Sequence, residues 1–124
     1  MFKLVSKGDW KRTSKFLNKM QNFFKSQSFD KYGRIGVIAL ESATPKDSGA
    51  TANAWSYEVE RKSGQVSIIW KNSNEPNGFP VAVMLQFGHG TGTGGYVRGI
   101  DYINPAMRPI FEEIAEDLWR EVTQ

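Results

Sequence analysis

Two stretches in the first third of the chain repeat apolar residues every three or four positions, which is the period of a helix packed on one side. The first covers about residues 9–25, with Asp9 placed as its cap and an apolar stripe of Trp10, Phe16, Leu17, Met20, Phe23 and Phe24. The second follows Ser28, another candidate cap, and ends before Pro45, because a residue that precedes proline is disfavoured in helical geometry. We therefore expect two consecutive helices.

The second helix contains two glycines, Gly33 and Gly36. Each glycine inside a helix costs about 0.5–1 kcal/mol relative to alanine. Either this helix is weak, or the glycines allow another backbone to pack closely against it. We favour close packing.

Beyond residue 50 the apolar period shortens to two, which is typical of half-buried strands. Residues 55–60 alternate apolar and polar side chains, and a strand-like run covers residues 66–70 after the turn Lys62-Ser63-Gly64. The pattern predicts an antiparallel hairpin, and Pro76-Asn77-Gly78 supplies the next turn.

The apolar run at residues 81–87 is either a buried strand or a short helix, because periodicity alone does not separate the two. Eight residues rich in glycine follow, at 88–95. Glycine loses the most backbone entropy in regular structure, so we expect a glycine-rich loop over residues 88–100, either mobile or ordered by a partner.

The last element is a helix over residues 105–123, with Asn104 as its cap and Pro105 in its first turn. Its apolar face consists of Ile110, Phe111, Ile114, Ala115, Leu118 and Val122. Pro109 either delays the regular helix until about Arg108 or bends it. The order of elements predicts an α+β fold, in which N-terminal and C-terminal helices pack on a small antiparallel sheet.

Composition fits a single domain spanning residues 1–124. Hydrophobic residues make up 40% of the chain and aromatic residues 13%, which is typical of a globular protein. The chain has no cysteine, which excludes disulfides and thiolate metal sites and is consistent with folding in a reducing cytoplasm. No run approaches the roughly 20 apolar residues of a membrane span, so we expect a soluble protein without a leader or membrane contact.

Charge is distributed unevenly along the chain. Residues 1–34 carry a net charge of +7, residues 35–100 are neutral, and residues 101–124 carry −4, which together give the overall +3. A chain that is basic at one end and acidic at the other can pair its ends within one copy or between neighbouring copies. Both arrangements remain open at this stage.

The basic N-terminal helix, residues 1–27 with its flanks, places lysines at intervals of four: Lys7, Lys11, Lys15 and Lys19. Such a stripe can meet solvent, an acidic protein surface or DNA phosphates, and four phosphate contacts would give a salt slope of about −3.6 on duplex DNA. We favour solvent or protein. No base-reading motif accompanies the lysines, so any DNA contact is expected to be nonspecific.

Three patterns suggest chemistry, and each has a simpler interpretation. Gly90-x-Gly92-x-x-Gly95 matches a dinucleotide fingerprint, but that motif needs a helix immediately afterwards, where this chain has Tyr96-Val97-Arg98-Gly99. His89 is the only histidine, which excludes a histidine pair for a metal. We expect no cofactor and no metal site here.

The third pattern is Glu60-Arg61-Lys62 with Asp47 upstream, which resembles the acid and acid-x-Lys arrangement of Mg²⁺-dependent nucleases. Glu58, Glu60 and Lys62 share one face of the expected hairpin, which is also the arrangement of an ordinary solvated face. We expect the solvated face, and therefore no catalytic residues and no enzyme.

A resemblance to a known family rests on three short motifs. The segment Ala43-Thr44-Pro45-Lys46-Asp47-Ser48-Gly49 resembles the Ala-x-Pro-x-Asp-Thr/Ser-Gly signature of siphophage neck, head–tail joining and tail-completion proteins. Leu85-Gln86-Phe87-Gly88 and Ile103-Asn104-Pro105-Ala106 resemble that family's aromatic–glycine segment and Pro-Ala helix start. The match extends from about Tyr32 to Val122. Gln86 stands where the family often has an acid, and the 88–95 tract is longer than its usual connection.

The resemblance implies a structural virion protein of the head–tail connector, acting as a homo-oligomeric ring. Its partners would be adjacent head-completion and tail-terminator or tail proteins, with assembly in the host cytoplasm and nonspecific contact with DNA in the channel. It implies structural roles for Pro45, Asp47, Ser48, Gly49, Phe87, Gly88, Asn104 and Pro105. The residues expected to contact partners or line the channel are Lys7, Lys11, Lys15, Lys19, His89, Tyr96 and Arg98.

Overall fold

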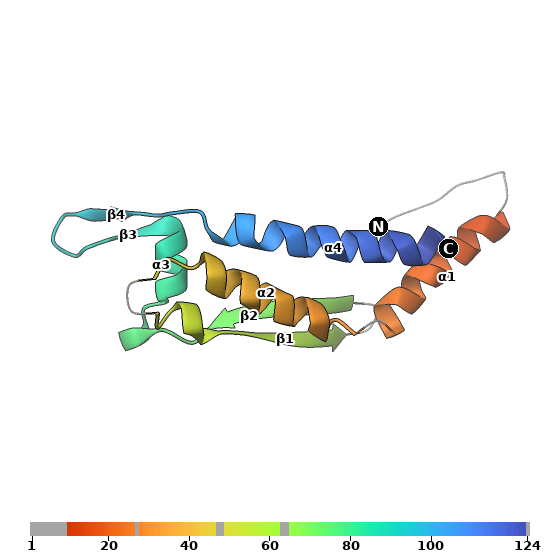
Figure 1. The fold of residues 1–124 in the computed structure, drawn as a ribbon, viewed down its shortest axis with the longest axis horizontal. Coiled ribbons are helices and arrows are strands. Elements are labelled where there is room, and N and C mark those ends of the chain that lie inside the picture. Colours follow the sequence, from red (N-terminus) through yellow and green to blue (C-terminus); the bar gives the residue numbers. More distant parts are fainter. Residues whose placement is uncertain (1–9, 27, 47–48, 63–64, 124) are drawn as a thin grey trace.

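The computed structural model describes residues 10–26, 28–46, 49–62 and 65–123. Its elements, in chain order, are α1 (Trp10–Ser26), α2 (Asp30–Ala43), a 3-10 turn (Ala52–Ala54), β1 (Trp55–Lys62), β2 (Gln65–Asn72), a second 3-10 turn (Pro76–Gly78), α3 (Val81–Phe87), β3 (Gly88–Gly90), β4 (Tyr96–Arg98) and α4 (Ile103–Thr123). The described molecule is elongated (Figure 1): α1 lies at one end, the β3–β4 hairpin extends at the other, and α4 runs between them.

The predicted α+β fold is confirmed. The described strands form two antiparallel pairs, β1–β2 and β3–β4. β1 and β2 pair from Trp55↔Asn72 to Lys62↔Gln65, so the first hairpin has the predicted position, although residues 63 and 64 of its turn lie outside the described part. An isolated hairpin is marginally stable in water, and here α2 packs against it.

Close packing at the two glycines of α2 is confirmed, but side chains take the place of the expected backbone. A Cβ atom at Gly33 would overlap the Tyr57 ring, and one at Gly36 would overlap the Trp70 indole. The indole Nε1 of Trp70 also donates a hydrogen bond to the Gly33 carbonyl oxygen (3.0 Å). The glycines therefore let two large aromatic side chains of the hairpin lie directly on the helix.

The core lies where α1, α2 and α4 meet and the first hairpin covers them. Its buried members are Phe23, Phe29, Tyr32, Leu40, Met107 and Ile110, and half-buried hairpin residues such as Val59 and Ile68 pack against them. One polar group enters this core: the fully buried Tyr32 donates its hydroxyl to Asp117 Oδ2 (2.6 Å). Asp117 also forms ion pairs with Lys31 (3.2 Å) and Arg120 (3.3 Å). This cluster ties α2 to α4.

The helix ends differ from the sequence predictions. Asp9 lies outside the described residues, and Ser28 does not cap α2: Phe29 occupies the N-cap without a side-chain bond, and the Ser28 hydroxyl donates to Asp30 instead (3.4 Å). Residues 81–87 form a helix, α3, which settles the open alternative.

The C-terminal helix begins at Ile103, two residues before the predicted start, so Asn104 lies inside it rather than capping it. Pro109 also lies inside the helix, so of the two alternatives given for this proline the delayed start near Arg108 is wrong. Although α4 has 21 residues, no helix in the described part of the chain is long and apolar enough to cross a membrane.

Candidate assembly surfaces

Residues 88–98 form a second hairpin at one end of the molecule. β3 pairs with β4 in the register Gly88↔Arg98, His89↔Val97 and Gly90↔Tyr96, and Thr91 N donates to the Gly95 carbonyl oxygen (3.0 Å) across the turn. The prediction of a glycine-rich loop over residues 88–100 is therefore wrong for both strands. Only the tip, residues 91–95, lacks regular structure within the hairpin.

Crowding explains the two glycines at the base of this hairpin, Gly88 and Gly99. Gly88 has a φ of +82°, and a Cβ atom on it would meet the Val97 carbonyl oxygen and the Tyr96 hydroxyl. A Cβ atom on Gly99 would overlap the Gln86 carbonyl oxygen and the Gly88 nitrogen. At these positions glycine permits close approach of two backbone segments. This packing offsets the entropy that glycine loses in regular structure, which is why part of the tract forms strands.

The hairpin is fixed to the body by hydrogen bonds centred on Gln86. The buried Gln86 side chain accepts from the backbone nitrogens of Tyr102 and Ile103 (both 3.0 Å) and donates to Asp101 Oδ1 (2.7 Å). Asp101 Oδ1 in turn accepts from Asn104 N (3.3 Å). These two side chains satisfy amide groups at the start of α4, in place of the predicted cap Asn104. The hydrogen bond from Gln86 is the main reason that the pKa of Asp101 is lowered.

Two more bonds hold the strand-to-helix connection in place. Ile100 N donates to the Leu85 carbonyl oxygen (2.9 Å), and the Tyr96 hydroxyl donates to the Phe87 carbonyl oxygen (3.0 Å). As a result the hairpin continues outward from α3, away from the remainder of the body (Figure 1).

Apolar side chains on and beside this hairpin remain uncovered. Phe87 is 70% exposed, Tyr96 67% and Ile100 61%, and Val97 is also exposed. Uncovered apolar patches on a folded chain mark sites of association, and aromatic residues are enriched among those that contribute most to binding. The hairpin is therefore the first candidate assembly surface.

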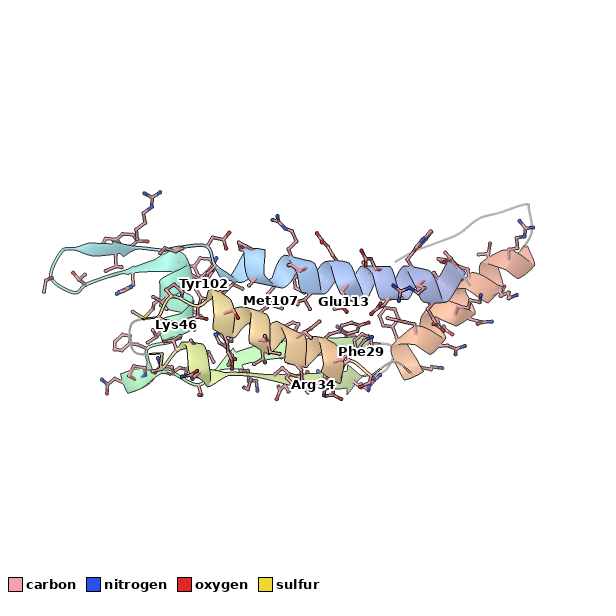
Figure 2. The ribbon with its side chains drawn as sticks, in the orientation of Figure 1. Phe29, Arg34, Lys46, Tyr102, Met107 and Glu113 are labelled. Atoms are coloured by element: carbon pink, nitrogen blue, oxygen red, sulfur yellow. The ribbon has the colours of Figure 1, made fainter. Side chains whose placement is uncertain are left out.

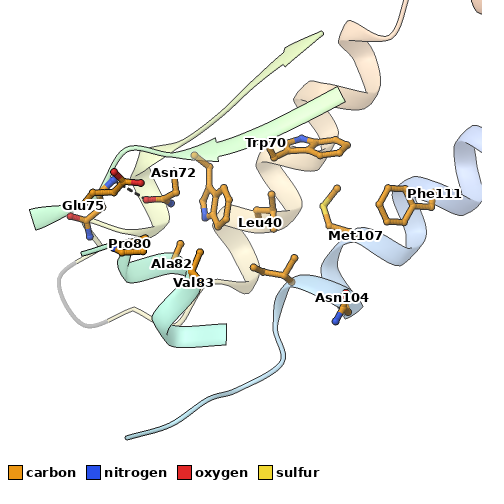
Figure 3. A pocket seen from close by; sticks show the side chains of 13 residues that line it. Leu40, Trp70, Asn72, Glu75, Pro80, Ala82, Val83, Asn104, Met107 and Phe111 are labelled. Atoms are coloured by element: carbon orange, nitrogen blue, oxygen red, sulfur yellow. Dashed lines mark hydrogen bonds between the residues drawn. The ribbon is translucent and has the colours of Figure 1, made fainter. Parts of the chain in front are cut away.

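A cavity of about 380 Å³ lies at the base of the same end and forms the second candidate surface. Its lining is mostly apolar and comes from α2, the first hairpin, the β2–α3 connection, α3 and α4: Leu40, Trp55, Trp70, Asn72, Asn74, Glu75, Pro80, Ala82, Val83, Ile103, Asn104, Met107 and Phe111. Figure 3 shows Leu40, Trp70 and Met107 around its interior, with Asn72, Glu75 and Asn104 farther out. Glu75 is the single charged residue of this lining.

The structure brings three of the sequence-predicted contact residues together and separates them from the others. Tyr96 and Arg98 are exposed on β4, and His89 is half-buried on β3 with no hydrogen-bond partner for its Nδ1 among the described residues. Lys15 and Lys19 belong to α1, at the opposite end of the molecule (Figure 1). Those predicted contact residues whose side chains are described therefore belong to two distant surfaces.

The lysine stripe is only partly described. Lys7 and the side chain of Lys11 lie outside the described part, Lys15 is exposed and Lys19 is half-buried. Although α1 packs against α4, the ion pairs between described residues do not join Lys15 or Lys19 to an acid of α4. Figure 2 shows side chains of α1 extending away from the body at this end.

The motif residues occupy two regions. Asp47 and Ser48 are outside the described part, while Gly49 has a φ of +80° and Pro45 is half-buried. Beside them, the buried Thr44 hydroxyl accepts from Trp55 Nε1 (2.8 Å) and donates to the Leu40 carbonyl oxygen, which fixes the end of α2 to the hairpin.

The other motif residues surround the second hairpin and the cavity. Phe87 is exposed, Gly88 lies where the backbones cross, Asn104 lines the cavity, and Pro105 is in the first turn of α4. These later motif residues thus lie at or beside the candidate assembly surfaces, whereas Pro45 and Gly49 do not belong to either surface.

The nuclease-like pattern lies on the outer face of the first hairpin. Glu58 is half-exposed and pairs with Lys71 (3.0 Å), Glu60 and Lys62 are exposed, and Asp47 is outside the described part. Within the described residues, no group of three histidines, cysteines or acids is close enough to hold a metal ion. The glycine pattern Gly90-x-Gly92-x-x-Gly95 lies in a hairpin tip, without the helix that phosphate binding needs.

Sequence reasoning missed several residues of these surfaces. Gln86 was noted only as a departure from the family pattern, yet it is the lone polar residue in the apolar run Val81–Phe87, and that isolation was a usable signal. Glu75 carried no signal, because nothing in its local sequence separates it from ordinary surface residues. Comparison of the chain with protein-family models, with curated proteins and with solved structures finds no match.

Proposed function

We propose that this protein is a structural subunit of the head–tail connector of a tailed bacteriophage, where it forms a ring between the portal side of the capsid and the tail. The observation that carries this proposal is the β3–β4 hairpin, which extends from one end with exposed apolar side chains at Phe87, Tyr96 and Val97. The motif resemblance gives the class of particle, and the exposed hairpin gives a physical reason for assembly.

The chemistry of the cavity also favours assembly over catalysis. General acid–base catalysis needs a titratable group positioned at the reacting centre, with a pKa tuned by its environment. Glu75 is the only titratable residue of the cavity lining, and it is exposed. The described residues whose pKa values shift are Tyr32, Asp101, Tyr102 and Asp117, and each of them takes part in a hydrogen bond that links two parts of the fold.

A ring subunit needs two different surfaces that fit one another. The exposed hairpin and the apolar cavity are two such surfaces, and the charge distribution along the chain supplies a further complementary pair. Basic residues of α1 at the far end can face the DNA that crosses the connector, since phosphate contacts need no base reading.

The test is assembly in solution and in particles. Native mass spectrometry of the purified protein, alone and mixed with the products of neighbouring virion genes, is expected to detect a closed oligomer in at least one mixture. Deleting the gene should give heads and tails that do not join. Monomer in every mixture, or normal joined particles without this protein, would overturn the proposal.

A second candidate is a nonspecific nucleic-acid-binding module, favoured by the exposed Lys15 and the basic character of α1. Titration with duplex DNA at 50 and 200 mM salt tests it, because binding through several phosphates weakens steeply with salt. The variant Lys15→Glu should weaken this binding if α1 is the contact, whereas Lys62→Glu on the first hairpin should not.

A further inference from the structure

The apolar residues of the second hairpin cannot be covered by the body from which it extends. The bonds from Ile100 N to Leu85 O and from the Tyr96 hydroxyl to Phe87 O fix the hairpin base along α3, and from there β3 runs outward and β4 returns beside it (Figure 1). Neither strand pairs with the first hairpin. Within the described part of the chain Tyr96 and Val97 stay exposed, and both are available to another molecule.

The cavity is an apolar space that could receive such side chains. Trp55, Trp70 and Met107 leave an apolar space of about 380 Å³ between β2, α3 and α4, with Val83 and Phe111 exposed at its edge (Figure 3). This volume is at the low end for a ligand pocket, and suits the side chains of a short protein segment.

We propose that the β3–β4 hairpin of one copy docks into this cavity of a second copy, with Tyr96 and Val97 as the apolar contacts. The inference rests on the proposed ring assembly and identifies the contact between its subunits. The shapes of the two surfaces support a second copy as the occupant. The hairpin projects from the body with exposed apolar side chains, and the cavity is a hollow with an apolar lining.

Charge supports the same pairing. Arg98 is the one formally charged residue among residues 88–100 if His89 is neutral, and Glu75 is the one charged residue that lines the cavity. Both are exposed, and neither forms an ion pair with another described residue. Arg98 follows Tyr96 and Val97 directly, so a hairpin that buries those two side chains brings Arg98 to the edge of the cavity.

The contact is head-to-tail, because the docking element and the receiving cavity are different surfaces. A repeated head-to-tail contact closes into a ring when its rotation divides a full turn, and otherwise gives a filament. Each copy in a closed ring uses both surfaces, so no apolar hairpin remains uncovered.

Cysteine cross-linking tests the contact directly, because the chain has no native cysteine. Two single-cysteine proteins, Glu75→Cys and Arg98→Cys, with tags of different mass, are mixed and treated with a short bis-maleimide. The mixed 75–98 product should exceed both same-site products. Predominance of same-site products, or equal yields of all three, would overturn the proposed contact.

Charge reversal gives an independent measurement by sedimentation. Arg98→Glu and Glu75→Arg should each weaken self-association about tenfold or more, and the double variant should recover most of that loss. Val97→Asp should abolish association with unchanged circular dichroism and thermal unfolding, since Val97 is already exposed. The matched control is Trp119→Asp on α4, 65% exposed and outside both surfaces, which should associate normally.

The outcomes separate this inference from the proposed function. Oligomers that persist in Val97→Asp but disappear in Trp119→Asp would overturn the hairpin–cavity contact. They would indicate instead that the subunits of the ring contact one another through α4. A wild-type protein that is monomeric at the highest accessible concentration also overturns the contact between copies. If that monomer still joins an oligomer with neighbouring virion proteins, the connector role survives with a different occupant of the cavity.

Discussion

Gly33 and Gly36 show how the smallest residue sets the distance between a helix and a sheet. The rings of Tyr57 and Trp70 occupy the volume that side chains at these positions would need. Glycine lowers helix propensity, and the aromatic packing above it compensates. The close approach also lets Trp70 Nε1 donate a hydrogen bond to the Gly33 carbonyl oxygen.

The variant Gly33→Ala is expected to destabilise the fold, although alanine is the better helix former. The helix gains about 0.5–1 kcal/mol, whereas forcing a methyl group into packed space costs about 1–3 kcal/mol. Because the obstructing atoms belong to a ring near its Cβ attachment, we expect the loss to dominate. Urea unfolding measures it. Ser42→Ala, at an exposed position of α2, is the control and should be neutral or slightly stabilising; equal effects would contradict the packing argument.

Gln86 is the residue on which the attachment of the second hairpin to α4 depends. Its amide is both acceptor and donor, and a carboxylate could supply only the acceptor beside Asp101. An acid at this position would place two carboxylates together. The neutral amide therefore matches the presence of Asp101.

We expect Gln86→Glu to lower the free energy of unfolding at neutral pH by about 1–3 kcal/mol, with recovery in mild acid. Burial and the charge of Asp101 would raise the pKa of the new carboxyl in the folded state above its value in the unfolded state. The native state would therefore take up this proton at a higher pH than the unfolded state does, and the free energy of unfolding would rise as pH falls. Unfolding between pH 4.5 and 8 measures this trend. Gln65→Glu, at an exposed strand position, should show no such recovery.

Among the elements, the β3–β4 hairpin depends most on backbone crowding. Gly99 passes so close to the backbone of residues 86–88 that any side chain there would displace one of the two segments. Gly90 in the same hairpin has only the Gly95 carbonyl oxygen within 4 Å of a built Cβ atom, at 3.9 Å. These two glycines therefore make a matched pair.

Gly99→Ala should displace the hairpin and impair self-association, while Gly90→Ala should be tolerated. Since the main core lies elsewhere, we expect Gly99→Ala to raise hydrogen exchange in residues 86–102 more than in α2 or the first hairpin. Exchange measured by mass spectrometry gives the comparison. Protection unchanged in Gly99→Ala would show that the crowding is relieved by small movements.

Across the whole molecule, the contact between Tyr32 and Asp117 joins the N-terminal half to the C-terminal helix. Burial, together with the hydrogen bond to Asp117, raises the pKa of Tyr32. The hydrogen bond from Tyr32, followed by Lys31, lowers the pKa of Asp117. The depressed carboxyl contributes stability above its unfolded pKa of about 4 that is lost as pH falls through the folded value. The Tyr32 phenol, whose pKa is raised, contributes stability below about pH 10. This contribution is lost as the pH rises towards the pKa of Tyr32 in the folded state.

Tyr32→Phe is expected to cost about 1–3 kcal/mol near neutral pH. The difference from the wild type should narrow below about pH 4 and above about pH 10, where one partner of the bond changes its charge in the unfolded state. Urea titrations across this range test it. The control is Tyr57→Phe, whose hydroxyl donates to Asp30 at an exposed site (3.0 Å) and should contribute little. A pH-independent difference would contradict the assigned linkage.

The basic helix α1 and the acidic helix α4 come from opposite ends of the chain and lie together in the fold. The basic α1 packs against the acidic α4 in the same copy, yet the described ion pairs of α4 go to Lys31 on α2 and to Arg120 within α4. Contact within one copy is therefore shown for the helices, whereas no described ion pair joins Lys15, which is exposed, or Lys19, which is half-buried, to α4. The proposed contact of α1 with DNA depends on this arrangement.

The sequence by itself determined the elements whose cause is local. Helical spacing placed α1 and α2, alternation placed β1 and β2, and Pro45 ended α2, because each signal is read over a few neighbouring residues. Glycines at 33 and 36 correctly indicated close packing, but the sequence could not identify Tyr57 and Trp70 as the groups packed there.

Only the tertiary structure decided the parts that form the candidate assembly surfaces. Whether residues 81–87 are helical, whether a glycine tract pairs as strands, and where α4 begins all depend on contacts across more than ten residues, such as Gln86 with Asp101 and Gly99 with Gln86. The cavity is the extreme case, since its lining comes from α2, the first hairpin, the β2–α3 connection, α3 and α4, which meet only when the chain is folded. Local pattern specifies which side of an element is apolar, and packing alone decides which apolar sides remain uncovered.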